Sequence, residues 1–337
     1  MKRKKPNETE YLYASARVRA TENRLIGGER IAQAIAARGT DDVNALIAQL
    51  SDSGNAQSVP ASDIFTEALG EAYRFVEDIA PEKKTVRPLE YQYDCNNIKS
   101  ALKCFLRGTS SDGMMFSFGT VPTEKILEMP ASRDFSALPK NMAESCEKAL
   151  EMYAKTGSPQ WIDILIDAAC FADMLEAARE SGDELVSDFV RTKIDLTNIM
   201  MCVRTLRIGA GVAALEILRE SLVPGGNIEP ERLLSLTDKE KEDGLSLAVS
   251  SAGYAGVASL VSEDREKVSL ASIERACDDA YMENVRKVRF VPFGASVLYA
   301  YIVAVEYEIK NLRIILAGKQ AGLSADTIRE RVRASYV

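Results

Sequence analysis

The chain has 337 residues, of which 46% are hydrophobic and 27% are charged, the composition of a folded protein with room for one to three domains. Its formal net charge is −8, and no stripe of Lys and Arg interleaved with aromatic residues offsets it, so nucleic acid is excluded as an expected partner. There is no histidine, and the six cysteines have no CxxC spacing, so we expect no metal site.

Neither a membrane span nor a signal peptide is expected. The longest uncharged apolar run, Ala295 to Val305, is about half the length that a spanning helix requires. Acidic residues follow the basic start Lys2 to Lys5, where a signal peptide would be apolar. This basic cluster can touch an anionic lipid surface, but a solvated terminus is the simpler interpretation. Scattered cysteines are typical of a protein in a reducing cytosol.

Helical periodicity runs through the chain and strand-like alternation is nearly absent, so the sequence predicts an all-α fold. The first helix is expected to begin at a capping box around Asn7 and to end at the glycine pair Gly27-Gly28. Further along, pairs of amphipathic helices are expected at 161–181 with 184–209, and at 272–288 with 294–318. Loops rich in Pro, Gly and Ser separate the blocks at 51–62, 107–119 and 223–229.

One polar pattern occurs three times: an acid, an asparagine three residues later with an aliphatic residue beside it, and a glycine fourteen residues after the acid. The copies are Asp94, Asn97 and Gly108; Asp195, Asn198 and Gly209; and Glu308, Asn311 and Gly322. Such a repeat predicts three related helical units. We assign them to residues 1–115, 116–222 and 223–321, and expect the C-terminal helix within 322–337 to complete the first unit.

A second pattern follows these helices: a glycine-containing turn that leads into a short helix with an acid and an aliphatic residue. Copies of this head pattern start at Gly28, Gly119, Gly226 and Gly322, which makes four heads for three units. The chain therefore begins with a tail-type helix at 16–25, which resembles the helix that ends a unit. It ends with a head-type helix at 324–333, which resembles the short helix that begins a unit. This offset suits either an open solenoid or a ring whose two ends share one unit.

The repeated acid and asparagine are expected on the rim of the apolar face of each long helix. Polar groups there need partners, so we expect them to bond loop amides or a neighbouring helix end and to fix how the helix docks. Direct contact with a partner protein is the alternative. The three glycines each follow Lys or Arg, which is typical of helix C-caps. A catalytic role is disfavoured because the pattern occurs three times.

Enzymatic motifs are absent from the sequence. Gly209-Ala-Gly211 matches a loose dinucleotide fingerprint, but Ile199 to Leu206 ahead of it is expected to be a helix, where that fingerprint requires a strand. Asp278-Asp279 lacks the second aspartate cluster of an all-α metal-dependent prenyl enzyme. We expect no catalytic residue and no cofactor, with an all-α enzyme that uses carboxylates and a metal as a minor alternative.

Both ends of the chain carry a family resemblance. The final stretch contains Val291-Pro-Phe-Gly294, Glu308-Ile-Lys-Asn-Leu-Arg313 and Ile328-Arg-Glu-Arg-Val332. It resembles the C subunit of archaeal and bacterial A/V-type ATPases, equivalent to the d subunit of the eukaryotic vacuolar ATPase. The segment Tyr11 to Glu22 resembles the opening of the same family, and Tyr93-Asp94 its first internal motif. Met200-Met201 departs from the basic residue that follows the other copies.

The resemblance implies three similar helical subdomains about a pseudo-threefold axis, with a funnel shape. It also implies a non-catalytic rotor subunit of a rotary ATPase, a socket on the cytoplasmic face of the membrane. Its expected partners are the central-shaft subunits and the proteolipid ring, between which it would transmit torque for proton or sodium transport. A free-standing helical-repeat scaffold that binds protein partners is the alternative.

Four basic residues near the two ends are candidates for holding the terminal helices together or for contacting the shaft: Arg17, Arg19, Lys310 and Arg313. Pairing within the chain is the preferred interpretation. Glu306 and Lys310 lie four residues apart and can form an ion pair along one face of the last long helix.

Overall fold

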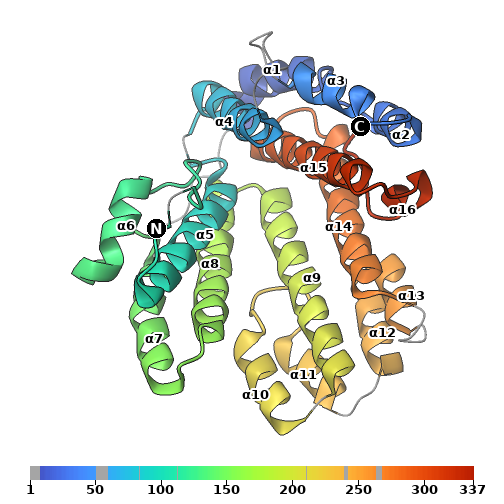
Figure 1. The fold of residues 1–337 in the computed structure, drawn as a ribbon. Helices are drawn as coiled ribbons and strands as arrows, with labels where there is room; N and C mark the ends of the chain where they lie inside the picture. The colour runs from blue at the N-terminus through green and yellow to red at the C-terminus, as the bar shows by residue number, and fades with distance from the viewer. Residues whose placement is uncertain are drawn as a thin grey trace. The chain divides into compact units, whose positions relative to one another are not determined.

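The computed structural model describes residues 8–50, 60–82, 84–111, 113–209, 211–238, 242–262 and 268–337. All regular secondary structure in these ranges is helical, which confirms the all-α expectation (Figure 1). The capping residue Asn7 and most of the loop expected at 51–62 lie outside the described residues. Within these ranges, no helix combines the length and the hydrophobicity that a transmembrane span needs.

The chain forms two compact units. The first unit combines residues 1–83 with 254–337, and the second contains residues 84–253. The helices of the first unit are η1 Glu8–Tyr11, α1 Leu12–Glu22, α2 Gly28–Ala36, α3 Asp41–Gln49, α4 Ala61–Ile79, α13 Ala255–Ser262, α14 Leu270–Arg286, η2 Lys287–Phe290, α15 Ala295–Gln320 and α16 Ala325–Arg329. Those of the second unit are α5 Arg87–Arg107, α6 Thr123–Ser132, α7 Lys140–Thr156, α8 Gln160–Ser181, α9 Glu184–Ile208, α10 Val212–Ser221, α11 Pro230–Asp238 and α12 Glu242–Ser251.

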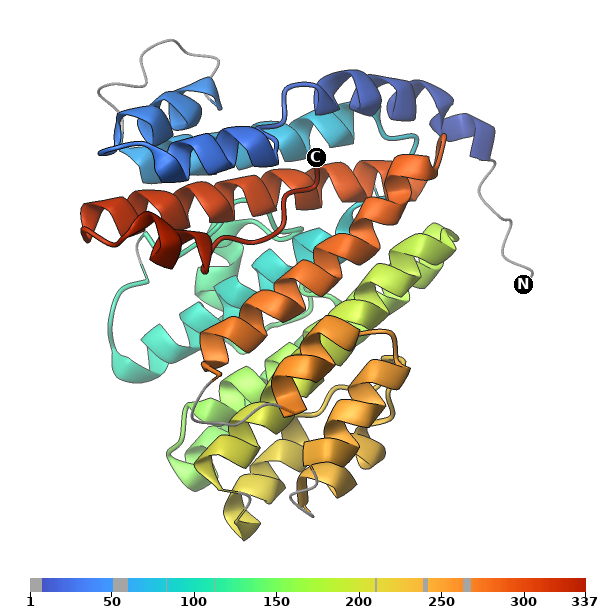
Figure 2. The ribbon, with the colours of Figure 1, turned by 90° about the vertical axis from the view of Figure 1, so that its right-hand side faces the viewer.

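The core of the first unit is organised around α15. Helices α1, α2, α3, α4 and α14 all contact it, and in Figure 2 it lies beneath the blue N-terminal helices. Every residue from Ala295 to Val305 is buried, which explains the long uncharged run in the sequence, because a helix covered on all sides is apolar all round. That run therefore belongs to a core helix.

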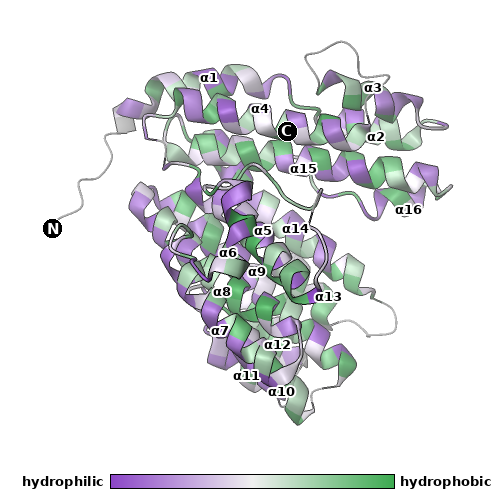
Figure 3. Ribbon diagram, turned by 60° about the vertical axis from the view of Figure 1, so that its left-hand side comes forward, coloured by the Kyte–Doolittle hydropathy of each residue, from purple (hydrophilic) through white to green (hydrophobic). Residues whose placement is uncertain are grey.

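The second unit is organised around α8 and α9. Helices α5 and α7 pack against α8, whereas α10 and α11 pack against α9. Figure 3 shows hydrophilic and hydrophobic residues alternating along the helices around these two, as expected for helices with one buried face. Asp183 caps α9, its side chain accepting a hydrogen bond from the N–H of Leu185 at 3.0 Å. The observed bounds of α8 and α9 agree with those expected to within one residue.

Two terminal helices are shorter than expected. Helix α1 ends at Glu22, and Gly28 begins α2 instead of ending the first helix, because the N–H of Ile26 bonds a side chain of α15. Helix α16 ends at Arg329 rather than at residue 333, because the backbone of Arg333 is engaged by another side chain of α15. In both places a contact distant in sequence overrides the local helical pattern.

Candidate functional site

In the first copy of the repeated pattern, two buried side chains of α5 bind the backbone ahead of α6. The Asp94 carboxylate accepts hydrogen bonds from the backbone N–H groups of Thr120 at 3.0 Å and Val121 at 3.1 Å, and from the Thr120 hydroxyl at 2.6 Å. The Asn97 amide accepts from the N–H of Phe116 at 2.9 Å and donates to its carbonyl at 2.7 Å. These directed bonds fix the path of the loop that leads into α6.

The second copy repeats this arrangement between α9 and α11. Asp195 accepts from the N–H of Ile228 at 3.0 Å and from the side-chain amide of Asn227 at 2.9 Å. Asn198 accepts from the N–H of Val223 at 2.9 Å and donates to its carbonyl at 2.8 Å. The spacing is the same in both copies. Val121 and Ile228, whose N–H groups bond the acid, each lie two positions before the next helix. Phe116 and Val223, which bond the asparagine, each lie five positions before those residues.

In the first two copies, the glycine of the head pattern lies directly against the carboxylate. A Cβ atom on Gly119 would lie 2.1 Å from Oδ1 of Asp94, and one on Gly226 would lie 2.2 Å from Oδ1 of Asp195. Both distances are far shorter than a van der Waals contact, so only glycine allows the loop to approach the acid this closely. The close approach explains why these two head patterns begin with glycine.

The third copy makes the same kinds of bond, but two separate segments of the chain supply the partners. Glu308 of α15 accepts from the N–H of Ile26 at 2.5 Å, a residue 282 positions away that lies two positions before α2. Asn311 accepts from the N–H of Arg333 at 2.9 Å and donates to its carbonyl at 3.0 Å. The continuous loop of the first two copies is thus replaced by one segment after α1 and another after α16.

The buried acids differ in how many donors they have. Asp94 has three donors, and burial still raises its pKa against the hydrogen bonds from Thr120 and Val121. Among the described residues, Ile26 supplies the one hydrogen bond to Glu308. Burial therefore raises the pKa of Glu308 to about 8, offset only in part by the Ile26 N–H and by Arg30.

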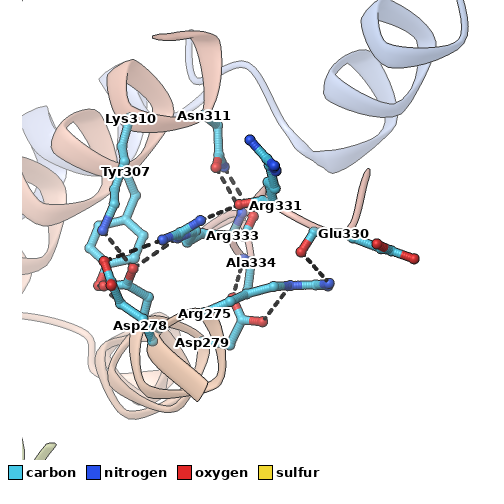
Figure 4. Close-up of polar contacts among 11 residues, drawn as sticks. Arg275, Asp278, Asp279, Tyr307, Lys310, Asn311, Glu330, Arg331, Arg333 and Ala334 are labelled. Atoms are coloured by element: carbon cyan, nitrogen blue, oxygen red, sulfur yellow. Dashed lines mark hydrogen bonds and ion pairs between the residues drawn. The ribbon is translucent and has the colours of Figure 1, made fainter. Parts of the chain in front are cut away.

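Residues 331–337, here called the C-terminal segment, are held by side chains of α14 and α15 (Figure 4). Asp278 accepts from Nε of Arg333 at 2.8 Å and pairs with Nζ of Lys310 at 2.5 Å. Asp279 accepts from the N–H of Ala334 at 2.6 Å. Burial alone would raise the pKa of Asp278, but the charges of Lys310 and Arg333 outweigh it and hold the pKa below its usual value.

The end of the C-terminal segment reaches the N-terminal helices of the same unit. Tyr336 is buried, and its hydroxyl lies 3.5 Å from a guanidinium nitrogen of Arg19. The carbonyl of Val337 accepts from the N–H of Gly28, the first residue of α2, at 3.1 Å. Seven residues without regular structure therefore join α14 and α15 to α1 and α2.

Arg19 links α1 to the turn between α14 and α15. Its guanidinium donates to the carbonyls of Val288 at 2.6 Å and Val291 at 2.9 Å, and it pairs with Glu22 at 2.8 Å. Burial lowers the pKa of Arg19, but its bonds to Glu22 and Tyr336 outweigh that effect and raise it. Arg19 is thus a charged group that ties the two ends of the chain together.

The other three basic candidates also contact elements of their own unit. The guanidinium of Arg17 lies 5.8 Å from the centre of the Phe75 ring, and that of Arg313 lies 5.2 Å from the Phe65 ring, both on α4. The pair that the spacing allows between Lys310 and Glu306 does not form: Lys310 pairs with Asp278 of α14. A bond across to a second helix replaces one along the helix surface.

The three glycines of the repeated pattern lie just beyond their helices with left-handed backbones. Gly108 follows α5 with φ of 65°, Gly209 follows α9 with φ of 90°, and Gly322 lies two residues beyond α15 with φ of 68°. Glycine adopts these angles without a steric penalty. The helix before Gly209 is α9, so the dinucleotide fingerprint lacks its strand.

Sequence reasoning considered Asp278 and Asp279 only as a metal motif and missed their contacts, which lie 55 positions away at Arg333 and Ala334. It also missed Asp173 of α8, which accepts from the N–H groups at the start of α7 at 2.9 and 3.0 Å. A lone acid on the buried face of a predicted helix is the signal that could have found it. In the part of the chain that the structure describes, no group of His, Cys, Asp and Glu is placed to hold a metal ion.

Comparisons with known proteins agree on one family. The family model described as ATP synthase (C/AC39) subunit matches residues 14–331. The C subunit of the A-type ATP synthase of Methanocaldococcus jannaschii is 23% identical, with 95% of this chain and 85% of that protein covered. Its counterpart in Thermococcus kodakarensis is 27% identical, with 96% and 90% covered. The C subunit of the V-type sodium ATPase of Enterococcus hirae is 23% identical, with 78% and 79% covered.

The matched region, residues 14–331, includes most of the two terminal motifs and all three copies of the repeated acid and asparagine. This match confirms the resemblance inferred from the terminal motifs: the chain belongs to the ATP synthase (C/AC39) subunit family.

Proposed function

We propose that the protein is a non-catalytic rotor subunit of a rotary A/V-type ATPase. It forms a socket that receives the central shaft and rests on the membrane proteolipid ring, peripheral to the cytoplasmic face, and it passes torque between the two during ion transport. The observation that carries this proposal is the family match over residues 14–331. The similar proteins, which are C subunits of A-type ATP synthases and of a V-type sodium ATPase, support it.

The geometry of the repeated joints suits the transmission of torque. Each long helix is held at its polar rim by a buried acid and a buried asparagine that bond backbone groups of a neighbouring segment. Such bonds are directional, and breaking one leaves a buried polar group without a partner, so the joints resist sliding more than apolar packing alone would. A stiff body loses less of an applied rotation to internal deformation.

The same joints support the proposed organisation into three similar helical subdomains, 1–115 completed by 322–337, 116–222 and 223–321. Each long helix docks on a head through the same pair of side chains, as expected for units related by a pseudo-threefold axis in a funnel. The third acid bonds Ile26, ahead of the head at Gly28. This contact favours a ring in which both ends of the chain share one unit over an open solenoid.

The proposal is tested by mixing the purified chain with the shaft subunits of its own organism and following the mixture by size-exclusion chromatography. Co-elution at a defined stoichiometry is expected, whereas the chain alone and the shaft alone elute separately. The chain alone should hydrolyse no ATP above the level of a buffer control. Separate elution of chain and shaft, together with failure to sediment with proteolipid rings, would show the assignment to be wrong.

A further inference from the structure

Phe290 is the most exposed large hydrophobic side chain in the described part of the chain, with 91% of its surface accessible. It is the last residue of η2, the short turn that connects α14 to α15. A single exposed apolar side chain is common on protein surfaces, so the ring alone identifies no partner. The charged residues around Phe290 set it apart from such a side chain.

The turn that carries Phe290 is rigid. Arg19 donates to the carbonyls of Val288 and Val291, which lie on either side of Phe290, and the Val288 side chain is fully buried. Three residues beyond Val291, the N–H of Gly294 donates to the hydroxyl of Ser15 on α1 at 3.3 Å. These bonds hold the backbone on both sides of Phe290 in place, so the position of the residue at the surface is set by the fold.

The same turn carries positive charge on an otherwise acidic protein. Lys287 and Arg289 are exposed on either side of the buried Val288, and neither forms an ion pair with another described residue. The acidic residue nearest in sequence, Glu283, lies one helical turn earlier on α14. Lys287, Arg289 and Phe290 together are here called the basic aromatic turn.

The start of α1 adds to this surface. Leu12 is 50% exposed and lies on the face of α1 that also carries Ser15 and Arg19, the two residues that bond the segment around Phe290. Figure 2 shows the start of α1 close to the junction of α14 and α15.

We propose that the basic aromatic turn docks on a membrane surface that contains anionic phospholipids. An exposed ring flanked by two cations matches the headgroup layer, where the ring enters the acyl boundary and the cations bind phosphates. The inference goes beyond the rotary role and does not require it, because the isolated chain alone should show the binding.

The test is co-sedimentation of the purified chain with vesicles of mixed phosphatidylglycerol and phosphatidylcholine, and with vesicles of phosphatidylcholine alone. We expect binding to the mixed vesicles that weakens as salt is added, and much weaker binding to the neutral ones. Phe290→Ala should lower the partition coefficient about tenfold. The matched control is Phe105→Ala, which removes a half-exposed ring from the second unit and should change nothing.

A second pair of variants separates the turn from net charge. The double variant K287E/R289E should reduce binding to the mixed vesicles at least about tenfold. K148E/K155E changes the net charge of the chain by the same amount at exposed positions of α7 and should bind like the parent. Melting curves should show all four variants to be as folded as the parent, since the altered side chains are exposed.

The proposal is overturned if the parent chain does not sediment with the mixed vesicles, or if the Phe290 and Phe105 variants bind equally. Equal loss in the two charge variants would also overturn it, because attraction would then follow net charge alone. Turn variants that bind vesicles like the parent but no longer co-elute with the shaft subunits would show that the turn contacts protein instead.

Discussion

Glu308 and Asp94 occupy the same place in the repeated pattern, yet Glu308 has one donor where Asp94 has three. Burial raises the pKa of Glu308 from 4.5 to about 8. The folded chain therefore binds this proton more tightly than the unfolded chain does. The stability that Glu308 contributes is fully present below about pH 4.5 and is lost as the pH rises through about 8.

Glu308→Gln should remove this pH dependence. A glutamine keeps an acceptor for the Ile26 N–H and stays neutral, so the parent should lose on the order of 2 to 4 kcal/mol of unfolding free energy relative to the variant between pH 5 and pH 8. Urea unfolding of both proteins across this range measures the difference, in which the titration of other groups cancels. Parallel stability curves would show that Glu308 does not titrate in this window.

Gly119→Ala should destabilise the second unit by about 1 to 3 kcal/mol, because the new methyl group would lie 2.1 Å from Oδ1 of Asp94. Gly211→Ala is the control: no atom lies within 4 Å of its Cβ position and its φ of −70° suits alanine, so about 0.5 kcal/mol or less is expected. The urea midpoints of the two variants, each compared with that of the parent, measure these losses of stability. Equal midpoints for the two variants would contradict the close approach.

At these positions the sequence placed the acid and the asparagine on the rim of a helix but did not identify their partners. Phe116, Thr120 and Val121 lie in a loop without periodicity, and they bond Asp94 and Asn97 mainly through backbone groups that every residue type possesses. Side-chain identity therefore carries little signal for these bonds. The glycine that faces the acid is the exception, since only its missing Cβ permits the contact.

Among the elements, the C-terminal segment has no regular structure, yet it joins helices from both ends of the chain. Its stability depends on side chains that it inserts or binds, chiefly Arg333 at Asp278 and the buried Tyr336 beside Arg19. Because Val337 accepts from the N–H of Gly28, loosening the segment should also loosen the start of α2.

Tyr336→Ala should destabilise the first unit by about 3 to 5 kcal/mol, since it empties a site that is 1% exposed. Hydrogen exchange of the Gly28 and Ile26 amides should accelerate with it. Tyr13→Ala, which removes a tyrosine that is 61% exposed, is the control and should cost less than about 1 kcal/mol. Unchanged exchange at Gly28 in the Tyr336 variant would mean that the segment does not hold α2.

Helix periodicity predicted the long elements well and the terminal ones poorly. Helices α8 and α9 are long and are followed by Gly182 and Gly209, and their bounds were expected to within a residue. The glycine pair after Ile26 has the local signature of a helix end, but α1 stops at Glu22 because a carboxylate 282 positions away bonds the Ile26 N–H. A contact of that separation leaves no mark in a local window.

At the scale of the whole molecule, Asn198 and its counterparts hold each long helix to a neighbouring segment. Asn198→Ala leaves the N–H and carbonyl of Val223 buried without their partner, which should destabilise the chain by about 2 to 4 kcal/mol. In the proposed complex, the loosened joint should lower the number of ions moved per ATP hydrolysed. Reconstituted vesicles measure that ratio.

Asn23→Ala is the matched control, because Asn23 is exposed and bonds only the nearby carbonyl of Ala20. It should change neither the unfolding free energy nor the coupling ratio, which is the number of ions moved per ATP hydrolysed. If Asn198→Ala destabilises the chain but the coupling ratio stays that of the parent, stiffness at this joint is not what transmits torque.

The sequence contains four head patterns for three units, and periodicity alone could not choose between an open solenoid and a ring whose two ends share one unit. In the structure Glu308 bonds the segment ahead of Gly28, while the region after Gly322 forms α16 and leads to Arg333. The function class was accessible because the terminal motifs resemble one family. The pairing of both chain ends in one joint required coordinates.

The most direct test of the rotary assignment is a bridging assay. Shaft subunits, proteolipid rings in vesicles and the purified chain are combined, and the shaft that sediments with the rings is measured with and without the chain. The account predicts that the shaft sediments with the rings only when the chain is present, in proportion to the chain added. Equal sedimentation of the shaft without the chain, or a chain that stays in the supernatant, would contradict it.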